Sequence, residues 1–328
     1  MAAAVLSTGA GAQERFPKPE PARAFAELKI YGADGSPVRT PKEEWDKART
    51  RVWAEAQWAA WLKEQRAECD AWMEAFPTDR ADWIAGWWHD FVDERTGAFL
   101  PWTPVPPAGV SEKVMGGWVF GFRTRHTQRM VQAARLWRLT GEERYAGWVI
   151  RQLDFYAENY EKWPVQTEKS KSRLMYQSLD DANVLVRLVE AARLVEDYAP
   201  PARKREWAEK LLRPMALLLD ETFQRVHNIA VWQRSAMGMA ALYLKDGDLW
   251  RRAIEAPFGL RRQMADGVTS DYLWVEQSFG YNSYVVSAVL PLLVYAGLEG
   301  RLGELKREAE IAENLMLAPS VLRFPDGR

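Results

Sequence analysis

Hydrophobic residues recur every three or four positions along most of the chain, whereas strict alternation of polar and apolar residues is nearly absent. The first pattern is typical of α-helices with one buried face, and the second would indicate β-strands. The helical pattern starts near Pro41 and continues almost to the end of the chain. We therefore predict an all-α protein.

Short joints with helix-stopping residues divide this pattern into paired helices; Thr140-Gly141, Ala199-Pro200 and Asp246-Gly247 are examples. The expected helices are a long first helix carrying Trp53 to Trp72, followed by 79–91, 122–139, 142–160, 174–198, 201–222, 228–245, 247–265, 281–298 and 302–317. Helix pairs of this kind favour a solenoid or a closed ring. Because no repeat of fixed period is present, we predict an α/α toroid, an incomplete barrel of antiparallel helix hairpins.

The sequence divides into three regions of different composition. Residues 1–42 are rich in Gly, Pro and charge and are expected to be a lead-in; their small-residue run resembles the end of a secretory signal without its basic start. A periplasmic or secreted location is therefore expected, with a cytoplasmic one as the alternative. Residues 43–318 are the predicted toroid, and within them 93–117 form a long Pro/Gly-containing connection. The turn signal in 319–328 predicts the start of a linker to a C-terminal domain.

Charge and residue usage exclude several classes of function. The formal net charge is -1, so no overall field would attract nucleic acid or an anionic membrane. The sequence contains no uncharged apolar run of membrane-spanning length, so we predict no membrane span. A single cysteine, Cys69, and three scattered histidines give no disulfide and no zinc spacing, so we expect no metal or cofactor in this chain. Seventeen tryptophans offer either packing bulk or flat faces for sugar rings.

Two stretches carry the candidate chemistry. In VHNIAVW, His227 and Asn228 start an otherwise apolar helix, where unpaired amides and the helix dipole favour a substrate carboxylate. A helix cap and a buried structural histidine are the plain alternatives. In DYLWVEQSFGYNSY, Gly280 is expected to permit a tight turn, after which Tyr281 and Tyr284 share one helix face. Packing is the alternative there, although the polar groups before Tyr281 favour a wet, concave site.

A family resemblance rests on these motifs. HNIAVW, its apolar helix and LWVEQSFGYNSY resemble the helical N-terminal domain of the heparinase II/III and oligoalginate lyase families of polysaccharide lyases. LMYQSLDDANVLVRLVEAARLV and RLWRLTGEERYAGWVIRQLDFYAENY are similar to two further helices of the group, so the resemblance covers roughly 83–327. Two positions depart from the pattern: Asn282 stands where a histidine is common, and Gln277 where a glycine is usual.

The resemblance implies β-elimination on an anionic, uronic-acid-containing polysaccharide or oligosaccharide. It makes Tyr281 the base, the acid or both, Asn228 and Gln177 neutral donors to the substrate carboxylate, and His227 a partner in either task. It also implies a downstream β-sandwich domain, which would hold any structural metal. Further candidates for substrate binding are aromatic, cationic or polar side chains near the motifs: Tyr176, Trp88, Arg123, Arg125, His126, Trp232, Glu276, Asn282 and Tyr284.

Two other functions remain open at this point. An α/α toroid also serves glycoside hydrolases, which need two carboxylic acids, and Asp180, Asp181 and Glu276 are the candidates. The third reading is a non-catalytic carbohydrate-binding domain. An unsaturated product would indicate a lyase, a product without the new double bond a hydrolase, and binding without turnover a binding domain.

Overall fold

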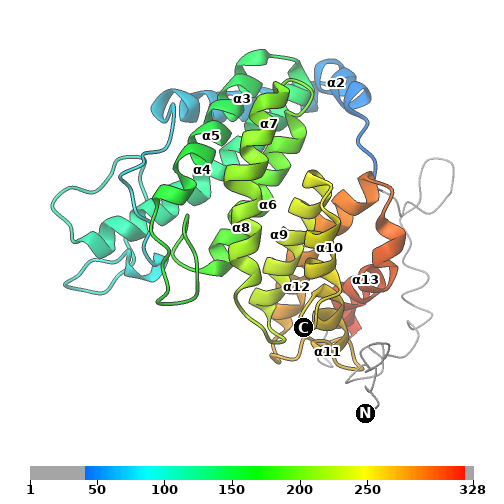
Figure 1. Ribbon diagram of the computed structural model, residues 1–328. Helices are drawn as coiled ribbons and strands as arrows, with labels where there is room; N and C mark the ends of the chain where they lie inside the picture. The colour runs from blue at the N-terminus through cyan, green and yellow to red at the C-terminus, as the bar shows by residue number, and fades with distance from the viewer. Residues whose placement is uncertain (1–40, 322–328) are drawn as a thin grey trace, which may run out of the picture. The chain divides into compact units, whose positions relative to one another are not determined.

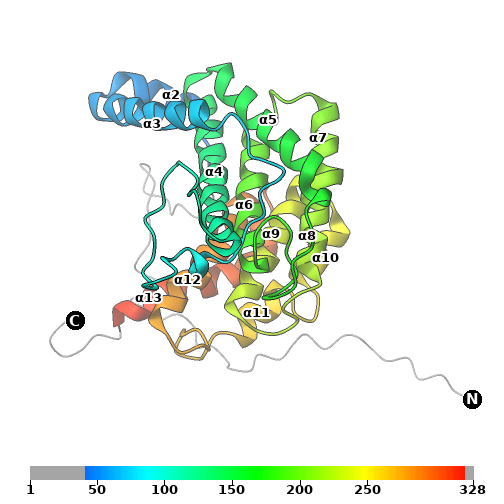
Figure 2. The same ribbon diagram turned by 90° about the vertical axis from the view of Figure 1, so that its left-hand side faces the viewer.

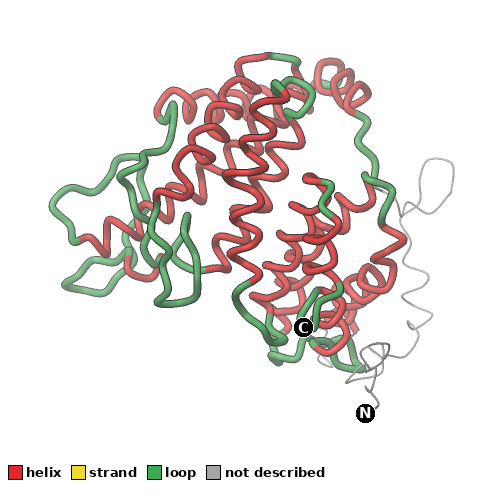
Figure 3. The backbone as a smooth tube through the Cα atoms, in the orientation of Figure 1, coloured by secondary structure: helices red, strands yellow, loops and turns green. Residues whose placement is uncertain are grey.

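A computed structural model describes residues 41–321, and Figure 1 shows it as a ribbon. Between these two residues the chain forms helices and loops with isolated β-bridges, and Figure 3 shows no strand there. The α-helices are α2 (Trp45–Ala54), α3 (Ala56–Ala75), α4 (Glu112–Thr140), α5 (Glu143–Asn159), α6 (Ser178–Leu194), α7 (Pro201–Trp207), α8 (Arg213–Asp220), α9 (Asn228–Leu244), α10 (Gly247–Ile254), α11 (Leu260–Asp266), α12 (Phe279–Leu298) and α13 (Lys306–Val321). The all-α prediction is confirmed.

The described chain divides into two compact units. The larger unit contains residues 42–222 and 236–249, and the smaller unit contains 223–235 and 250–321 together with Pro41. Helix α9 belongs to the smaller unit through Ser235 and to the larger unit from Ala236 onward. Closure of the hairpins into a toroid stays a prediction, as does the boundary at 318; helix α13 continues to Val321. The expected lead-in and most of the expected linker lie outside the described residues.

Helix α4 is the centre of the larger unit, where it packs against α5 and α6 (Figure 2). Ser111 caps its start by accepting a hydrogen bond from the Val114 amide at 3.4 Å, and Gly141 ends it in a left-handed conformation with φ of 74°. Both ends therefore follow the usual capping chemistry. The fully buried Trp118, Phe122 and other apolar side chains of α4 then anchor the helix in a hydrophobic core.

The prediction that 93–117 is one long connection was partly wrong, because α4 starts at Glu112. Gly116 and Gly117 are not helix breakers here. A Cβ on Gly116 would lie 2.8 Å from the Gly86 nitrogen, and one on Gly117 would lie 2.8 Å from the Phe91 Cβ. The two glycines let the preceding segment lie directly against the helix.

The expected helix 79–91 is absent; the segment forms turns and one 3₁₀ turn, η1 (Trp88–Asp90). The long first helix breaks at Glu55, whose backbone is extended, into α2 and α3. Its aromatic positions are not core residues either, since Trp53, Trp58 and Trp61 are at least 38% exposed.

Other predicted helices are interrupted for local reasons. The stretch 201–222 contains a π-helical segment, η3 (Ala208–Leu212), immediately before Pro214. The stretch 247–265 stops at Ile254 and restarts after Gly259. These are the places where proline or glycine departs from regular α-helical hydrogen bonding.

Cys69 lies on α3 and is fully buried beside Met73, with 3.7 Å between the two sulfur atoms. Burial raises the pKa of its thiol to about 12. The sequence interpretation of Cys69 as a small apolar residue agrees with this environment.

Helices α12 and α13 pack together in the smaller unit. Helix α12 is long and apolar enough to cross a membrane by length and composition, and 56% of its apolar window is buried within the fold. Core helices pass the same test, so the predicted absence of a membrane span stays a prediction.

Candidate functional site in the smaller unit

The start of α9 and the segment before α12 meet at the Glu276 carboxylate. The Asn228 backbone N–H donates to Glu276 Oε2 at 2.9 Å, and the Asn228 side-chain Nδ2 lies 2.9 Å from both carboxylate oxygens. Trp274 Nε1 donates to Oε2 at 2.6 Å. One carboxylate thus joins two segments that lie 48 positions apart in the sequence.

The segment before α12 is held in an irregular conformation. Gln277 has a φ of 60° and Tyr272 a φ of 57°, values that non-glycine residues rarely adopt. Asn282 stabilises this turn: its Oδ1 accepts from the Trp274 amide at 2.8 Å, and its Nδ2 donates to the carbonyls of Tyr272 and Leu315. The expected turn at Gly280 is displaced, because α12 already starts at Phe279.

Asn282 is therefore corrected from a substrate contact to a structural residue. It is 1% exposed, and its amide group binds three backbone groups in two segments, the turn before α12 and helix α13. The buried asparagine satisfies backbone groups that would otherwise lack partners.

The hydrogen bonds of His227 determine its tautomer. Its Nδ1 accepts from the Ile229 amide at 3.1 Å, so the neutral ring carries its proton on Nε2. Nε2 lies 3.7 Å from Glu276 Oε1, too far for a good hydrogen bond. Burial lowers the pKa of His227, and this effect outweighs the opposite effect of the Glu276 charge. At neutral pH His227 is therefore a half-buried neutral donor through Nε2.

Glu276 stays ionised beside it. Burial alone would raise the pKa of Glu276, but hydrogen bonds from Trp274 and Asn228 outweigh burial and lower it. Asn228 itself is 4% exposed, so in this structure it holds Glu276 in place from inside the fold. The side chains of His227 and Glu276 are about one quarter exposed and form the accessible part of the cluster.

Three aromatic rings extend the cluster along α12. Trp232 lies one turn into α9 and packs on Tyr284 with ring centroids 5.5 Å apart, and Tyr284 in turn lies 6.4 Å from Tyr281. Tyr281 is 37% exposed, and its hydroxyl has no hydrogen-bond partner among residues 41–321. The smaller unit therefore carries an unbonded phenol and an aromatic surface at the start of α12, and the His227–Glu276 pair joins the start of α9 to the segment before α12.

The sequence did not single out Gln263, a fully buried residue of α11. Its Oε1 accepts from the His227 amide at 3.0 Å, and its Nε2 donates to the carbonyls of Arg225 and Phe258. Gln263 thereby fixes the backbone on which His227 stands. A glutamine in a short amphipathic segment gives no signal of this task.

Candidate residues in the larger unit

Gln177 stands at the start of α6 with an extended backbone, and its carbonyl accepts from the amides of Asp180 and Asp181. Burial raises the pKa of Asp180 to about 7, although a hydrogen bond from the Gln177 side chain lowers it. Tyr176 donates its hydroxyl proton to Glu168. Trp88 packs against Phe91, Phe99 and Phe120, so aromatic neighbours already contact the ring that was predicted to bind sugar.

Arg123 and His126 are corrected from substrate contacts to core residues, because both are fully buried. Arg123 donates to Asp79 at 2.9 Å and to two backbone carbonyls. His126 Nδ1 accepts from Trp72 Nε1, and His126 Nε2 lies 2.9 Å from the side-chain oxygen Oε1 of Gln152. Burial lowers the pKa of His126. Neither side chain reaches solvent.

Arg125 is half-buried and accessible. Its guanidinium stacks over Trp102 at 4.2 Å and donates to the Gly121 carbonyl at 3.0 Å. Its role as a contact for an anionic sugar stays a proposal.

Two of the three carboxylates of the hydrolase alternative, Asp181 and Glu276, are engaged in hydrogen bonds. Asp181 is buried and accepts from the amides of Arg173 and Met175, at 2.8 and 2.7 Å. Glu276 accepts from Asn228 and Trp274 as described. No specific observation favours a pair of acids flanking a glycosidic bond. Within the described ranges, His, Cys, Asp and Glu side chains form no group of three or more that could hold a metal ion.

Comparison with known proteins places this geometry in context. The family described as alginate lyase matches residues 123–300, more than half of the chain, and this range includes helices α9 to α12. An alginate lyase of Stenotrophomonas maltophilia is 27% identical over 192 residues, which are 55% of this chain and 25% of that protein. An exo-oligoalginate lyase of Saccharophagus degradans is 30% identical over 141 residues, 41% of this chain and 19% of that protein. The matches thus span a quarter or less of these relatives.

Proposed function

This chain belongs to the alginate lyase family, and from this premise we propose that it is the helical part of a polysaccharide lyase that cleaves a uronic-acid chain by β-elimination. Alginate or its oligomers are the proposed substrate, because both relatives are named for them. The resemblance to the heparinase II/III family stays a prediction. The observation that carries the proposal is the cluster at the starts of α9 and α12, with His227, Glu276 and Tyr281 on adjoining turns.

The reaction makes two demands on such a cluster: the first is a hydrogen-bond donor to the substrate carboxylate, and the second is a group that transfers protons. A base removes the C5 proton while the bond from C4 to its oxygen breaks, a C4=C5 double bond forms, and the departing oxygen receives a proton. The intermediate places additional negative charge on the neighbouring carboxylate. A donor to that carboxylate therefore lowers the barrier, because the developing charge is stabilised where it forms.

His227 suits the first demand. Its Nε2–H is not hydrogen-bonded to Glu276 at 3.7 Å and belongs to a half-buried ring, so it is available to a substrate carboxylate. Because Nδ1 already accepts from the Ile229 amide, the neutral ring has no free lone pair with which to remove a proton. We therefore assign His227 to carboxylate binding and leave the proton transfers to Tyr281.

Tyr281 suits the second demand. Its hydroxyl is accessible and is not committed to another group in the described chain. A phenol can protonate the departing oxygen directly, and it can accept the C5 proton where a neighbouring donor stabilises the phenolate. Asn228 and Gln263 act behind the site by holding Glu276 and the His227 backbone. Gln177 belongs to the larger unit, and its role as a donor stays a prediction from the resemblance.

The test is Tyr281→Phe in the protein at its full natural length, assayed on alginate and oligoalginate by the ultraviolet absorbance of the unsaturated product. Loss of a general acid or base lowers turnover by roughly 10² to 10⁴. The unfolding midpoint should not change, since the removed hydroxyl is exposed and unbonded. Tyr198→Phe is the control, because Tyr198 is 38% exposed and should leave turnover intact.

Three outcomes would contradict the proposal. Normal turnover of Tyr281→Phe would remove Tyr281 from the chemistry. Cleavage without the new double bond would indicate a hydrolase. Binding of the polymer without any cleavage by the wild type would indicate a carbohydrate-binding domain.

A further inference from the structure

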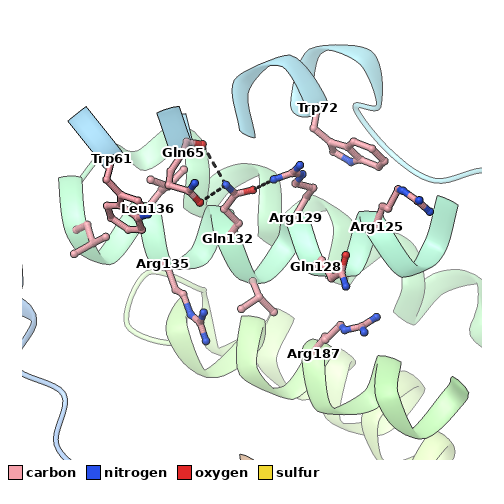
Figure 4. Close-up of a pocket in the computed structure, with 12 residues that line it drawn as sticks. Trp61, Gln65, Trp72, Arg125, Gln128, Arg129, Gln132, Arg135, Leu136 and Arg187 are labelled. Atoms are coloured by element: carbon pink, nitrogen blue, oxygen red, sulfur yellow. Dashed lines mark hydrogen bonds between the residues drawn. The ribbon is translucent and has the colours of Figure 1, made fainter. Parts of the chain in front are cut away.

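The larger unit contains a pocket with a volume of about 590 Å³, bounded by α3, one face of α4, and α6 (Figure 4). Arg125, Gln128, Arg129, Gln132 and Arg135 line it from α4, at the i, i+3, i+4 spacing of a single helix face. Figure 4 shows Arg187 reaching from α6 toward this row. The twelve lining residues include four arginines and no aspartate or glutamate.

Two of the arginines form no close ion pair with a carboxylate. Arg125 and Arg187 have no carboxylate within ion-pair distance among residues 41–321. Arg187 makes long hydrogen bonds of 3.3 and 3.4 Å from one nitrogen to Thr124 and Thr127. Burial lowers the pKa of both guanidinium groups, and Asp180 counteracts this effect at Arg187. A partly buried cation without a close carboxylate is unfavourable, and an anion in the pocket would relieve that cost.

The other two arginines are partly neutralised. Arg129 donates to Glu68 at 2.8 Å and to Gln132, while Arg135 lies 3.6 Å from Glu190. Neither acid lines the pocket. The positive charge therefore faces inward, and the carboxylates lie outside the cavity.

The remaining lining indicates the kind of anion. The indole rings of Trp61 and Trp72 come from α3, and Gln65, Gln128 and Gln132 supply neutral amide groups. Indole faces stack on sugar rings, amides hydrogen-bond hydroxyl groups, and arginines bind carboxylates in a planar geometry. The volume lies in the range of pockets for organic ligands and is large for a single inorganic anion.

We propose that this pocket is a binding site for carboxylated sugars, in which Arg125 and Arg187 hold the carboxylates of an oligouronate and Trp61 packs against a sugar ring. The choice of uronate rests on the proposed function. The pocket itself rests on the arginines, the amides and the indoles, all of which belong to the larger unit.

The test reads occupancy at the pocket itself. The full-length protein carrying Tyr281→Phe is labelled with 5-fluorotryptophan, and the fluorine signal of Trp61 is identified by its loss in Trp61→Phe. Saturated mannuronate trisaccharide is the probe, mannotriose is its uncharged counterpart, and sodium sulfate tests for a general anion site. We expect the Trp61 signal to shift in a saturable manner with the trisaccharide alone.

Removal of the proposed contacts should weaken binding. Arg125→Gln and Arg187→Gln should each raise the apparent Kd by roughly ten- to a hundredfold, as expected for loss of a charged hydrogen bond. Arg205→Gln, an exposed position on α7, is the matched control and should leave the Kd unchanged. Arg135→Gln, whose side chain is 58% exposed, provides a variant with little risk to folding and should also raise the Kd.

The proposal is overturned if the Trp61 signal does not move, if mannotriose or sulfate moves it equally, or if binding survives in the arginine variants. These outcomes are separable from the proposed function. Formation of unsaturated product by the wild type, with an unresponsive Trp61 in the labelled variant, would leave the lyase in place and remove the pocket. Binding at Trp61 with no product from the wild type would do the reverse.

Discussion

Two carboxylates of this protein, Glu276 and Asp180, differ in how their surroundings treat the negative charge. Glu276 is ionised, about one quarter exposed, and receives hydrogen bonds from Asn228 and Trp274. Asp180 is half-buried, and its buried Oδ2 has no hydrogen-bond partner among the described residues. The first arrangement stabilises the charge, whereas the second opposes it.

Replacement of Asp180 should show this cost. Its pKa is raised to about 7 in the folded chain, from a usual value near 4, so ionisation opposes folding above about pH 7. Below that value the proton is bound in the folded state and the cost disappears toward pH 4. Asp180→Asn should therefore be more stable than the wild type at pH 8, by on the order of 1 to 4 kcal/mol, with a smaller gain at pH 5.

Urea unfolding at both pH values measures this effect. Asp271→Asn, at an exposed position, serves as the control and should change stability equally little at pH 5 and pH 8. An Asp180→Asn protein with the same stability difference at both pH values would show that Asp180 is already neutral, or already compensated, at pH 8.

The sequence allowed the residues of the α9 and α12 starts to be picked out, but not their tasks. His227, Tyr281 and Glu276 stand at unusual places in apolar surroundings, which is a local signal. The roles of Asn228 and Asn282 depend on which groups from distant parts of the sequence lie beside them in the folded chain. The local sequence does not indicate those groups. For this reason buried polar anchors such as Gln263 and Arg123 were missed or misread as substrate contacts.

At the scale of elements, the entrance to α4 is the clearest case of packing overriding local propensity. A Gly-Gly pair inside a helix lowers its intrinsic stability by roughly 1 kcal/mol per glycine. The chain accepts this cost because Gly116 lies directly against the backbone of Gly86, to which it also provides a hydrogen-bond acceptor at 2.8 Å.

Gly116→Ala should destabilise the larger unit. The new Cβ would lie 2.8 and 2.9 Å from backbone atoms of Gly86, which cannot move aside as a flexible side chain can. We expect a loss of about 1 to 3 kcal/mol. Gly147→Ala in α5 is the matched control: its nearest neighbour is the tip of Arg151 at 3.7 Å, so the substitution should be neutral or stabilising by up to about 1 kcal/mol. Thermal unfolding of both variants tests the pair, and equal behaviour would contradict the close-packing explanation.

Helices with strong periodicity next to a helix-stopping glycine were predicted close to their observed bounds. An example is α5, which starts just after the glycine that ends α4, Gly141. The failures lie where periodicity is shared by aromatic residues that stay exposed, as around Trp53, or where a turn-rich segment packs on a helix, as in 79–91. Hydrophobicity alone does not distinguish a buried face from an aromatic surface.

At the scale of the whole molecule, one buried ion pair connects distant parts of the larger unit. Arg123 on α4 binds Asp79 and the carbonyls of Trp83 and Leu174, and the hydroxyl of Tyr156 on α5 also donates to Asp79 at 3.1 Å. Both charged side chains are at most 1% exposed. The network thereby fixes two long loops to the helices that lie beneath them.

Arg123→Met should remove this connection and leave the Asp79 charge buried without a counter-charge. Breaking one side of a buried pair costs about 3 to 5 kcal/mol. The double variant Asp79→Asn, Arg123→Met removes both charges and should recover part of the loss, as measured by chemical unfolding. A double variant no more stable than the single one would show that the hydrogen bonds to the loop carbonyls, and not the unpaired charge, dominate.

Cys69 has a consequence for how this protein can be studied. It is the sole sulfhydryl in the sequence, it is sealed inside the fold, and its high pKa keeps it protonated and therefore unreactive at neutral pH. A cysteine placed at an exposed position such as Arg205 would be the one group that a maleimide dye or spin label meets. This chain of 328 residues is thus already a suitable background for attaching a single spectroscopic probe, without prior removal of a natural thiol.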